Sequence, residues 1–398
     1  MCGFAGIHSE HIEESLFAKA LDEIHYRGPD HHAITSVENL WLGHNRLAII
    51  DLDVRSNQPF YSDDFRYCLI FNGEIYNYKS IKERLIKEGY KFRTASDTEV
   101  ILHSYDKWKE KCFIQFHGMF SFALVDKLEK KLILARDRFG EKPLFYSLKD
   151  GILAFGSELR IFKKLMPDLK LNYPALIDFL HFGFVPAPKT VYNDVYKLLP
   201  GTYMLYDYND HKTIQKGTFY DLGFNESHAD LSLTAKKDLF QEIGDKVASE
   251  ISIADVPLGA FLSGGVDSGG AVHFLKNATQ SLQTFTAGFD SKQFDESPRA
   301  KLVAEHFGVT NINRKVHIDD FIGQYNNMID HYAEPHNDFS FIPTYLICKE
   351  ARKYHTVMIS GDGADEIFCG NPRYHKLREI SLLKSIKPLV KMEAFLTY

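Results

Sequence analysis

The sequence predicts a two-domain protein of mixed α/β and α+β class, in which the second domain is a parallel doubly wound sheet. At 398 residues the chain is too long for one ordinary hydrophobic core. An apolar run, 256–261, leads through a Gly-rich turn, 262–268, into a helix-like segment, 269–276. Apolar strands then alternate with helical segments as far as 357–366. Such alternation is typical of a parallel sheet with its ligand site at the carboxyl ends of the strands.

The Gly-rich turn is typical of a nucleotide site. It has the sequence Leu262-Ser263-Gly264-Gly265-Val266-Asp267-Ser268. A strand, a glycine turn and a helix aim backbone N–H groups and the helix dipole at phosphate. No Gly-Lys-Ser/Thr follows, so Asp267 would instead hold a Mg²⁺ ion that bridges the phosphates. The alternative is a structural corner in which the glycines only make a tight turn. The whole string resembles the pyrophosphate loop of ATP pyrophosphatases, which adenylate a carboxylate.

Composition excludes several other classes of function. A formal net charge of −6 without a long basic run argues against a nucleic-acid or acidic-membrane partner. The sequence contains no apolar run of membrane-spanning length and no signal peptide, so we expect a cytoplasmic protein. The five cysteines are irregularly spaced without a Cys-x-x-Cys pair, which indicates neither a disulfide framework nor a zinc site.

Cys2 is the candidate nucleophile of the first domain. Removal of Met1 would place a thiol and an α-amino group on one residue. The amine titrates at about 8 and the thiol at about 8.5, so the amine can take the thiol proton. For Met-Cys alone, an incidental buried cysteine is the alternative. Residues 2–7 read as a strand of small residues, and they resemble the start of class II glutamine amidotransferases, whose mature N-terminal residue is the catalytic cysteine.

The segment 71–77 resembles the Asn-Gly-Glu-Ile-Tyr-Asn string of the same family. By this resemblance, the Asn72 amide and the Gly73 N–H form an oxyanion hole, where preorganised donors stabilise developing negative charge. The resemblance also places Glu74 in the glutamine site. The alternative is that Asn-Gly is only the turn of a β-hairpin.

Two further motifs match the family in order. The segment 43–51 resembles its His-x-Arg-Leu strand, which implies that Arg46 clamps the glutamine α-carboxylate, as suits a guanidinium fork. The segment 96–100 resembles its Ser-Asp-x-Glu-Val helix start, which implies that Asp97 binds the α-ammonium. The alternatives are a surface arginine and an ordinary helix N-terminus, although Ser96 can cap the helix while Asp97 binds.

Local patterns then organise the chain up to the second domain. Segments 120–125 and 132–136 predict a hairpin. Residues 136–144 resemble a stretch of the asparagine-synthetase branch, which we interpret as structural, lining the passage between two sites. We expect a glutaminase domain at 2–217, a polar linker at 225–230 and a nucleotide domain at 231–398 that begins with a helix.

In the second domain, 285–289 predicts the second parallel strand, 295–306 a helix and 309–317 the next strand. The segment 357–366 resembles the synthetase signature Ser-Gly-Asp/Glu-Gly-x-Asp-Glu. This implies that Asp365 shares Mg²⁺ with Asp267 and that Asp362 binds the aspartyl substrate. The implied ATP-binding set is Phe261, Leu262, Ser263, Gly264, Gly265, Asp267, Ser268, Ala287, Ser360 and Gly361.

From residue 2 to about residue 374 the chain resembles the glutamine-hydrolysing asparagine synthetases. The resemblance implies an αββα sandwich of the N-terminal-nucleophile type followed by an adenine-nucleotide α/β sheet. It also implies glutamine, aspartate and ATP as substrates, with Mg²⁺, and is compatible with a homodimer. Family members continue beyond Tyr398, so we expect the second domain to be incomplete.

Three alternatives remain open from the sequence. The chain could amidate another carboxylate, such as a sugar acid or a peptide, or it could be a glutaminase-only remnant. It could also be a non-catalytic relative that binds glutamine. The joint presence of Cys2, Arg46, Asn72, Gly73 and Asp97 argues against the last alternative.

Overall fold

A computed structural model of the chain describes residues 1–223, 227–338, 340–372, 374 and 376. It contains two compact units. The first comprises Met1–Phe240, Ile253–Val256 and Ile318–Ile342, and the second comprises Gln241–Ser252, Pro257–His317 and the described residues from Pro343 onwards. The predicted domain bounds, 2–217 and 231–398, stay a prediction. The end of the second predicted domain, 377–398, and part of the predicted linker lie outside the described residues.

The first unit contains two six-stranded antiparallel sheets. One is ordered β10-β8-β9-β1-β3-β2 and consists of β1 (Gly3–His8), β2 (His31–Val37), β3 (Leu40–Arg46), β8 (Phe145–Lys149), β9 (Ile152–Gly156) and β10 (Tyr196–Lys197). The other is ordered β12-β11-β7-β6-β5-β4 and consists of β4 (Phe60–Tyr61), β5 (Tyr67–Ile75), β6 (Gly118–Asp126), β7 (Lys131–Arg136), β11 (Thr202–Asp207) and β12 (Lys212–Thr218). The antiparallel pairing of β6 with β7 confirms the predicted hairpin.

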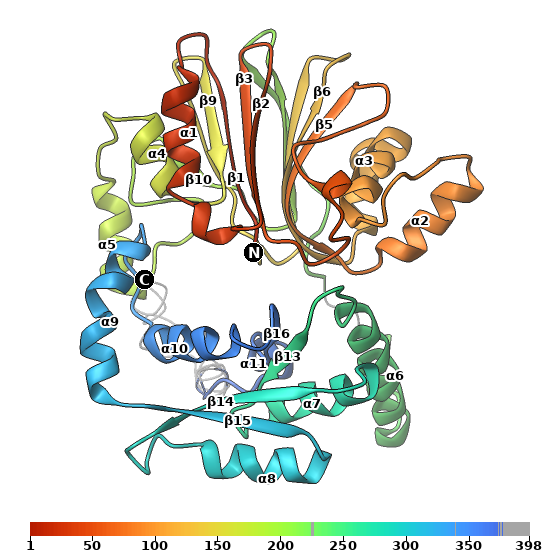
Figure 1. Ribbon diagram of the computed structural model, residues 1–398, viewed down its shortest axis with the longest axis vertical. Helices are drawn as coiled ribbons and strands as arrows, with labels where there is room; N and C mark the ends of the chain where they lie inside the picture. Colours follow the sequence, from red (N-terminus) through yellow and green to blue (C-terminus); the bar gives the residue numbers. More distant parts are fainter. Residues whose placement is uncertain (224–226, 339, 373, 375, 377–398) are drawn as a thin grey trace, which may run out of the picture. The chain divides into compact units, whose positions relative to one another are not determined.

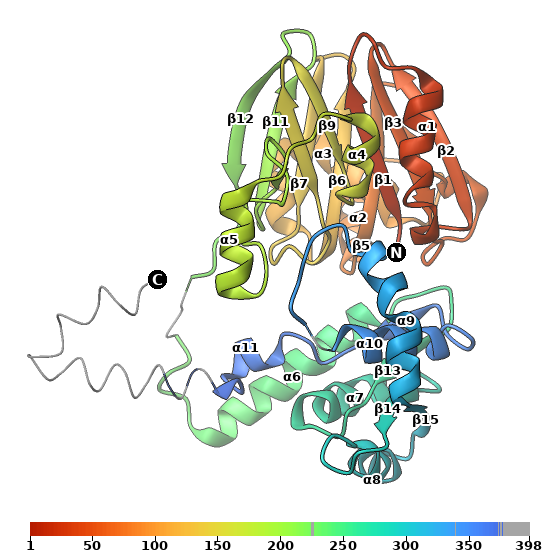
Figure 2. The same cartoon turned by 90° about the vertical axis from the view of Figure 1, so that its left-hand side faces the viewer.

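The two sheets lie face to face between helices (Figures 1 and 2). Helices α1 (Glu14–Asp22) and α4 (Arg160–Leu165) cover the first sheet, and α2 (Tyr78–Lys87) and α3 (Asp97–Trp108) cover the second. Every residue of β1 is buried. Since alternate side chains of a strand point to opposite sides, both faces of β1 are covered. Phe4 packs between the sheets, while Ala5 and Ile7 pack against α1. The unit is therefore an αββα sandwich, as the resemblance implied.

The second unit is a four-stranded parallel sheet in the order β15-β14-β13-β16. Its strands are β13 (Leu258–Phe261), β14 (Gln283–Phe289), β15 (Thr310–Val316) and β16 (Val357–Ile359). The remaining elements of the described chain are α5 (Tyr173–Phe182), α6 (Leu233–Ile251), α7 (Val266–Ala278), α8 (Ser297–Phe307), α9 (Ile318–His331), α10 (Phe341–Ala351), α11 (Ala364–Phe368), and the 3₁₀ turns η1 (His25–Arg27), η2 (Val54–Ser56) and η3 (Lys109–Gln115).

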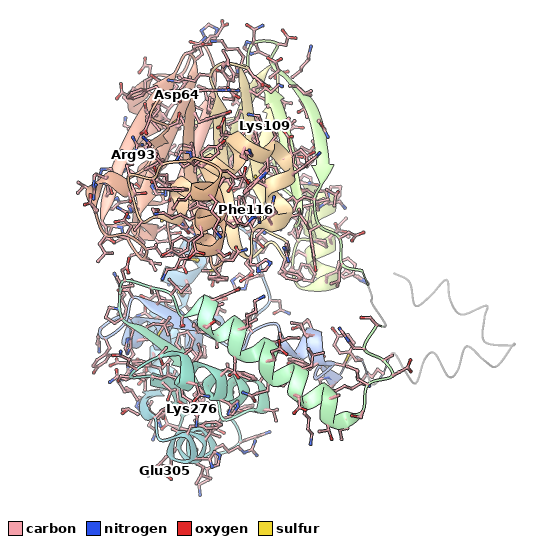
Figure 3. The ribbon with its side chains drawn as sticks, turned by 90° about the vertical axis from the view of Figure 1, so that its right-hand side faces the viewer. Asp64, Arg93, Lys109, Phe116, Lys276 and Glu305 are labelled. Atoms are coloured by element: carbon pink, nitrogen blue, oxygen red, sulfur yellow. The ribbon has the colours of Figure 1, made fainter. Side chains whose placement is uncertain are left out.

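Helices pack on both faces of the parallel sheet, which confirms the doubly wound class. On one face, Ala260 and Leu262 share a core with residues of α6, α7 and α8. On the other face, Phe285 packs against Ile347 of α10. Lys276, in the last turn of α7, lies 4.9 Å from the ring centroid of Phe307 and so joins α7 to α8 (Figure 3).

The order of the strands places two Gly-rich loops, 262–265 after β13 and 360–363 after β16. Strands β13, β14 and β15 follow one another in one direction, and β16 returns to the other side of β13. The crevice of a doubly wound sheet lies where the order reverses, outside the carboxyl ends of the strands. The loops after β13 and β16 flank this point. In the described part of the chain, helices of membrane-spanning length and hydropathy are absent.

Candidate functional site

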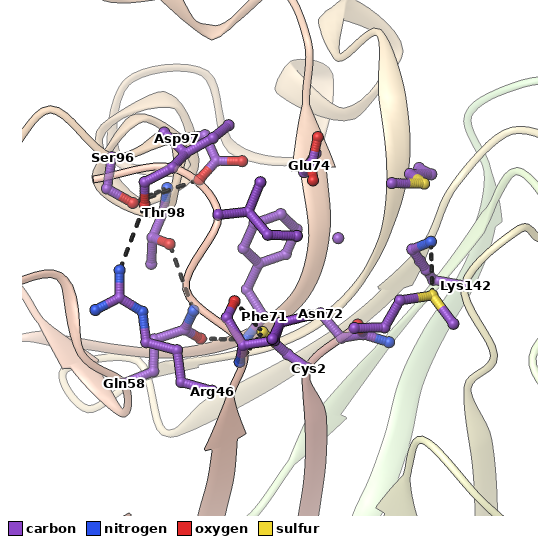
Figure 4. A pocket seen from close by; sticks show the side chains of 16 residues that line it. Cys2, Arg46, Gln58, Phe71, Asn72, Glu74, Ser96, Asp97, Thr98 and Lys142 are labelled. Atoms are coloured by element: carbon purple, nitrogen blue, oxygen red, sulfur yellow. Dashed lines mark hydrogen bonds between the residues drawn. The ribbon is translucent and has the colours of Figure 1, made fainter. Parts of the chain in front are cut away.

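One cavity of the first unit brings together Cys2, Arg46, Asn72, Gly73, Glu74 and Asp97 (Figure 4). These residues come from the position just before β1, the end of β3, the last part of β5 and the first turn of α3. The other residues that line the cavity are Met1, Leu47, Ile49, Ile50, Gln58, Phe71, Ser96, Thr98, Met119 and Lys142. Every residue that the resemblance assigned to glutamine therefore lies at one cavity.

Cys2 lines the cavity and is held there by contacts with backbone groups and with Arg27. Its Sγ accepts a hydrogen bond from the Leu47 N–H at 3.4 Å, and Arg27 Nε donates to the Cys2 carbonyl at 2.9 Å. Arg27 is itself held by Glu158, at 2.8 Å. Burial raises the pKa of the Cys2 thiol, while the amino terminus and the Leu47 backbone lower it. A thiol in this position needs a neighbouring base to react at neutral pH.

Asn72 and Gly73 lie inside β5, paired with Ser121 and Phe120 of β6, so the hairpin-turn alternative is wrong. Gly73 has φ +152°, and a Cβ there would meet the Met119 carbonyl oxygen at 2.1 Å. A side chain at this position would therefore clash with the neighbouring strand.

Beyond its short pairing with β4 at residues 68 and 69, β5 presents the backbone of the side opposite β6 to the cavity. The Phe71 N–H donates to Gln58 Oε1 at 2.6 Å, and the Ile75 N–H donates to Asp97 Oδ2 at 3.0 Å. Because backbone groups of alternate residues point to the same edge, the N–H of Gly73 lies on this edge between them. His44 Nε2 donates to the Phe71 carbonyl at 3.0 Å and fixes the strand next to Asn72.

The side-chain amide of Asn72 is fully buried, and neither its Nδ2 nor its Oδ1 has a hydrogen-bond partner in the described chain. A buried amide without a partner costs about 1–3 kcal/mol. Such a group is explained when a ligand completes its hydrogen bonds. Together with the Gly73 N–H, it provides two donors where charge would develop on a substrate oxygen.

Arg46 supplies positive charge to the cavity wall. Its side chain is buried, and Nη1 donates to the Asp53 carbonyl at 3.1 Å and to Asn57 Oδ1 at 2.7 Å. Nη2 donates to the carbonyls of Ile50 and Asp51. Neutral acceptors thus hold the guanidinium in place and leave its charge for an anionic ligand.

Glu74 and Asp97 supply negative charge. Burial, and secondarily the charge of Asp97, raise the pKa of Glu74 to about 7. Burial raises the pKa of Asp97 to about 6, although hydrogen bonds from the backbone of Ile75 and Thr98 lower it. Glu74 Oε1 has no partner in the described chain. An ammonium group would neutralise this pair. The Thr98 N–H donates to Ser96 Oγ at 3.1 Å, which confirms the predicted N-cap.

Lys142 was not among the predicted site residues. The sequence favours a structural role for the segment 136–144, but the side chain of Lys142 lines the cavity and is buried. Asp137 shapes this turn, since its Oδ2 accepts from the N–H groups of Lys142 and Phe120. The lysine is far from the other cavity residues in sequence, so only the fold reveals its position.

In the second unit, the loop after β13 is stabilised by its own serines. Ser263 Oγ and Ser268 Oγ are 2.9 Å apart, and the Gly265 N–H donates to Ser263 Oγ at 3.2 Å. Helix α7 begins at Val266 rather than at 269, so Asp267 lies in its first turn. The serine contacts close the turn at 263–268, so the helix begins earlier than the predicted start at Gly269.

The two Gly-rich loops touch each other. A Cβ on Gly361 would lie 3.1 Å from the Ser268 N and 3.2 Å from the Asp267 carbonyl carbon. In the second loop, Ser360 Oγ donates to Asp362 Oδ2 at 2.9 Å, and Asp365 lies in the first turn of α11. Phe261 and Ala287, from the predicted ATP-binding set, pack against the apolar cluster around Phe285.

The carboxylates of this region suit a metal that arrives with its substrate. In the described ranges, no group of three or more His, Cys, Asp or Glu residues is placed to hold a metal ion. Mg²⁺ commonly takes one or two protein carboxylates and completes its shell with substrate phosphates and water. Asp267 and Asp365 are carboxylates of the kind this donor set uses and lie in the first turns of α7 and α11, and their sharing of Mg²⁺ stays a prediction.

Both parts of the chain are similar to known protein families. Residues 1–220 match a family model described as a glutamine amidotransferase domain, and residues 239–394 match one described as asparagine synthase. An asparagine synthetase (glutamine-hydrolysing) 1 of Bacillus subtilis is 35% identical over 96% of this chain. A provisionally named asparagine synthetase (glutamine-hydrolysing) 2 of Methanocaldococcus jannaschii is 34% identical over 93% of it.

A Penicillium rubens protein named amidase chyE is more distant, at 26% identity over 92% of the chain. The chain spans 60% of the length of the Bacillus relative, 75% of the Methanocaldococcus relative and 56% of the Penicillium relative. The motifs, the αββα sandwich, the parallel nucleotide-type sheet and these matches agree. The chain belongs to the glutamine-hydrolysing asparagine synthetase family.

Proposed function

We propose that this protein is a glutamine-dependent asparagine synthetase, which hydrolyses glutamine at Cys2 and transfers ammonia to ATP-activated aspartate. The products would be asparagine, AMP, pyrophosphate and glutamate. The observation that carries the glutaminase half is the cavity in which Cys2 and the unpartnered Asn72 amide lie together with charges of both signs.

The charges of the cavity match zwitterionic glutamine. Arg46 would bind the α-carboxylate, and Asp97 with Glu74 would bind the α-ammonium. With both ends held, the side-chain amide lies at Cys2, and its oxygen meets the Asn72 amide and the Gly73 N–H. This arrangement orients the substrate before reaction.

The thiol and the α-amino group of Cys2 would carry out the chemistry once Met1 is removed. The amine takes the thiol proton, and sulfur attacks the amide carbon. Asn72 and Gly73 stabilise the resulting oxyanion. The amine then gives its proton to the departing nitrogen, so ammonia leaves and a thioester remains. Water hydrolyses the thioester, which releases glutamate and restores the thiol.

The two Gly-rich loops would carry the second half of the reaction. Backbone N–H groups of 262–265, with Ser268, Ser360 and Gly361, would bind the ATP phosphates at the N-terminus of α7. Asp267 and Asp365 would hold Mg²⁺, which neutralises phosphate charge when bound. Phe261 and Ala287 would contact the adenine side of the nucleotide, and Asp362 would bind aspartate. Family membership and the contact of Gly361 with the first loop support this assignment.

Two variants test the halves separately. Cys2→Ala should abolish glutamate release and leave the formation of asparagine from ammonia, ATP and aspartate. Asp267→Asn should reduce pyrophosphate release and leave glutamine hydrolysis unchanged. Normal glutamate release by purified Cys2→Ala protein would rule out the glutaminase assignment, and unchanged pyrophosphate release by Asp267→Asn would place the nucleotide elsewhere.

A second candidate is an amidotransferase that acts on another carboxylate. The similarity to the Penicillium rubens protein named as an amidase favours it. That protein matches 92% of this chain but is not named as an asparagine synthetase. Glutamate and asparagine should be measured together, with and without aspartate and ATP. Near-equal amounts support the synthetase. Glutamate without asparagine indicates another acceptor or hydrolysis alone.

The same proposal includes a cytoplasmic location and a homodimer. It places the glutaminase domain at 2–217 and the nucleotide domain at 231–398. Light scattering of the purified protein tests the oligomeric state.

A further inference from the structure

Lys142 is the buried charge of the glutamine cavity that the proposed chemistry leaves without a role. Its side chain lines the cavity, and its Nζ lies 3.0 Å from Met1 Sδ (Figure 4). The backbone of Lys142 is fixed on both sides, since its N–H donates to Asp137 Oδ2 at 2.9 Å and its carbonyl accepts from Arg136 Nε at 2.8 Å. The turn therefore holds the lysine in the cavity.

A buried ammonium is unfavourable unless neighbouring charges or a function compensate it. Burial lowers the pKa of Lys142, while Glu141, Glu74 and Asp137 raise it and Arg27 lowers it. Carboxylates thus favour the cation from two sides of the residue. Within the described residues no carboxylate oxygen forms a salt bridge with Nζ, and its contact in the cavity is the Met1 sulfur.

Removal of Met1 changes the surroundings of this cation. The residue that it contacts leaves, and a free α-amino group forms on Cys2 at the bond where Met1 was attached. Covalent geometry limits the distance from a methionine sulfur to the next residue's nitrogen to roughly 6 Å. The Lys142 ammonium therefore lies within about 9 Å of the new amino group, at a cavity that Lys142 and Cys2 both line.

We propose that Lys142 is an electrostatic positioning residue for glutamine hydrolysis, whose cation keeps the Cys2 α-amino group neutral and favours the thiolate. It acts through Cys2 and does not itself contact the reacting amide. The inference rests on the proposed glutaminase function. A nearby positive charge disfavours a second ammonium and favours an anion, so both groups shift in the direction that the reaction requires.

The other charges around Cys2 do not replace this effect. Arg27 and Arg46 also lower the pKa of the Cys2 thiol. Arg27 is neutralised by its ion pair with Glu158, and glutamine's carboxylate would neutralise Arg46 on binding. Asp97 and Glu74, the carboxylates of the cavity, would be occupied by the substrate ammonium. When the thiol reacts, Lys142 then remains as a cation of the cavity that forms no salt bridge within the described residues.

The test is the pH profile of kcat/KM for glutamate release by Lys142→Met, Lys142→Gln and Lys142→Arg. Loss of the cation raises the pKa of both the amine and the thiol, so the acidic limb should move to higher pH by about one unit. Lys142→Arg should restore the original limb. Lys149→Met is the matched control. Lys149 is an exposed lysine at the end of β8, the strand that follows Lys142 in the chain, and its loss should leave the profile unchanged.

A limb that stays in place in the neutral variants, or one that moves equally in Lys142→Arg, would overturn the proposal. The pH dependence of iodoacetamide alkylation of Cys2, followed in the N-terminal peptide, reads thiol ionisation without turnover. Wild-type protein that releases no glutamate would defeat the proposed function, while the alkylation profile would still decide the role of Lys142. Two neutral variants guard against one that fails to fold.

Discussion

The glutamine cavity and the two Gly-rich loops solve recognition in different ways. In the cavity, Arg46, Asn72, Glu74 and Asp97 are each at most 5% exposed, and polar atoms of Asn72 and Glu74 have no hydrogen-bond partner among the described residues. In the loops, the serines already bond to each other or to a neighbouring carboxylate, as Ser360 bonds to Asp362. One site stores unmet hydrogen-bonding capacity, and the other is locally satisfied before any ligand arrives.

The difference follows from the ligands that each site would bind. A small zwitterion with a neutral reacting amide needs fixed, desolvated groups, because only these discriminate and stabilise a small developing charge. A polyphosphate carries enough charge to bind to backbone N–H groups and a helix dipole at a partly exposed edge. Substitutions should therefore produce large, specific losses in the cavity and small, graded losses in the loops.

The largest effect that we expect beyond loss of the nucleophile is from Asn72→Ala. Removal of one oxyanion donor should lower kcat for glutamine hydrolysis about 10²–10³-fold. Because the amide has no partner in the described chain, the variant should lose activity without losing hydrogen-bonding energy in the fold. Initial rates at saturating glutamine, with thermal unfolding as the control, test this. A loss below about tenfold would mean that the amide is not aimed at the substrate.

Asp97→Asn should affect binding rather than turnover. Replacing a charged hydrogen bond to the substrate ammonium should raise KM for glutamine about 10–100-fold, with a small change in kcat. Asp63→Asn is a matched control, because Asp63 is an exposed carboxylate of the same unit that pairs with Arg93. If kcat falls while KM stays constant, Asp97 does not hold the ammonium.

Features encoded by neighbouring residues could be predicted from the sequence. The β6–β7 hairpin, helix α8 with strand β15, and the Ser96 cap lie close to their predicted places, because alternation and capping are local. The six glutamine-site residues were assigned through motifs, and the structure brings all six to one cavity.

The supporting groups could not be predicted, because they come from distant segments. Gln58 and His44 hold the Phe71 backbone from two different parts of the chain. No motif in the sequence assigns this role to either residue. Lys142 reaches the cavity through a turn shaped by Asp137. Burial and unmet hydrogen bonds, which distinguish the two sites most clearly, are properties of packing that a linear pattern does not contain.

The two buried carboxyl groups of the cavity also predict a pH dependence of glutamine binding. The pKa values of Glu74, about 7, and Asp97, about 6, lie above their ordinary values because both carboxyls are buried. As pH falls through this range the carboxyls become protonated and lose their attraction for the substrate ammonium. Calorimetry on Cys2→Ala protein, which cannot turn over, should show affinity about tenfold weaker at pH ~5.5 than at pH ~7.5. Constant affinity would mean that neither carboxylate faces the ammonium.

The smallest effect that we expect is at the contact between the Gly-rich loops. In Gly361→Ala the new Cβ would lie 3.1 Å from the Ser268 nitrogen, so the loops must separate by a few tenths of an ångström. Because their phosphate donors are backbone groups, a small shift should weaken ATP-dependent pyrophosphate release only about three- to tenfold.

Gly269→Ala is the matched control for this variant. Gly269 lies inside α7, and a Cβ there would lie at an ordinary 3.6 Å from Val303 Cγ1. Alanine also raises helix propensity there, so stability should rise slightly and activity should stay constant. Glutamine hydrolysis should be unchanged in both variants. A loss of a hundredfold or more in Gly361→Ala would show that the loops, like the cavity, depend on fixed geometry. The contrast between an exact, desolvated site and a tolerant, backbone-based one would then fail.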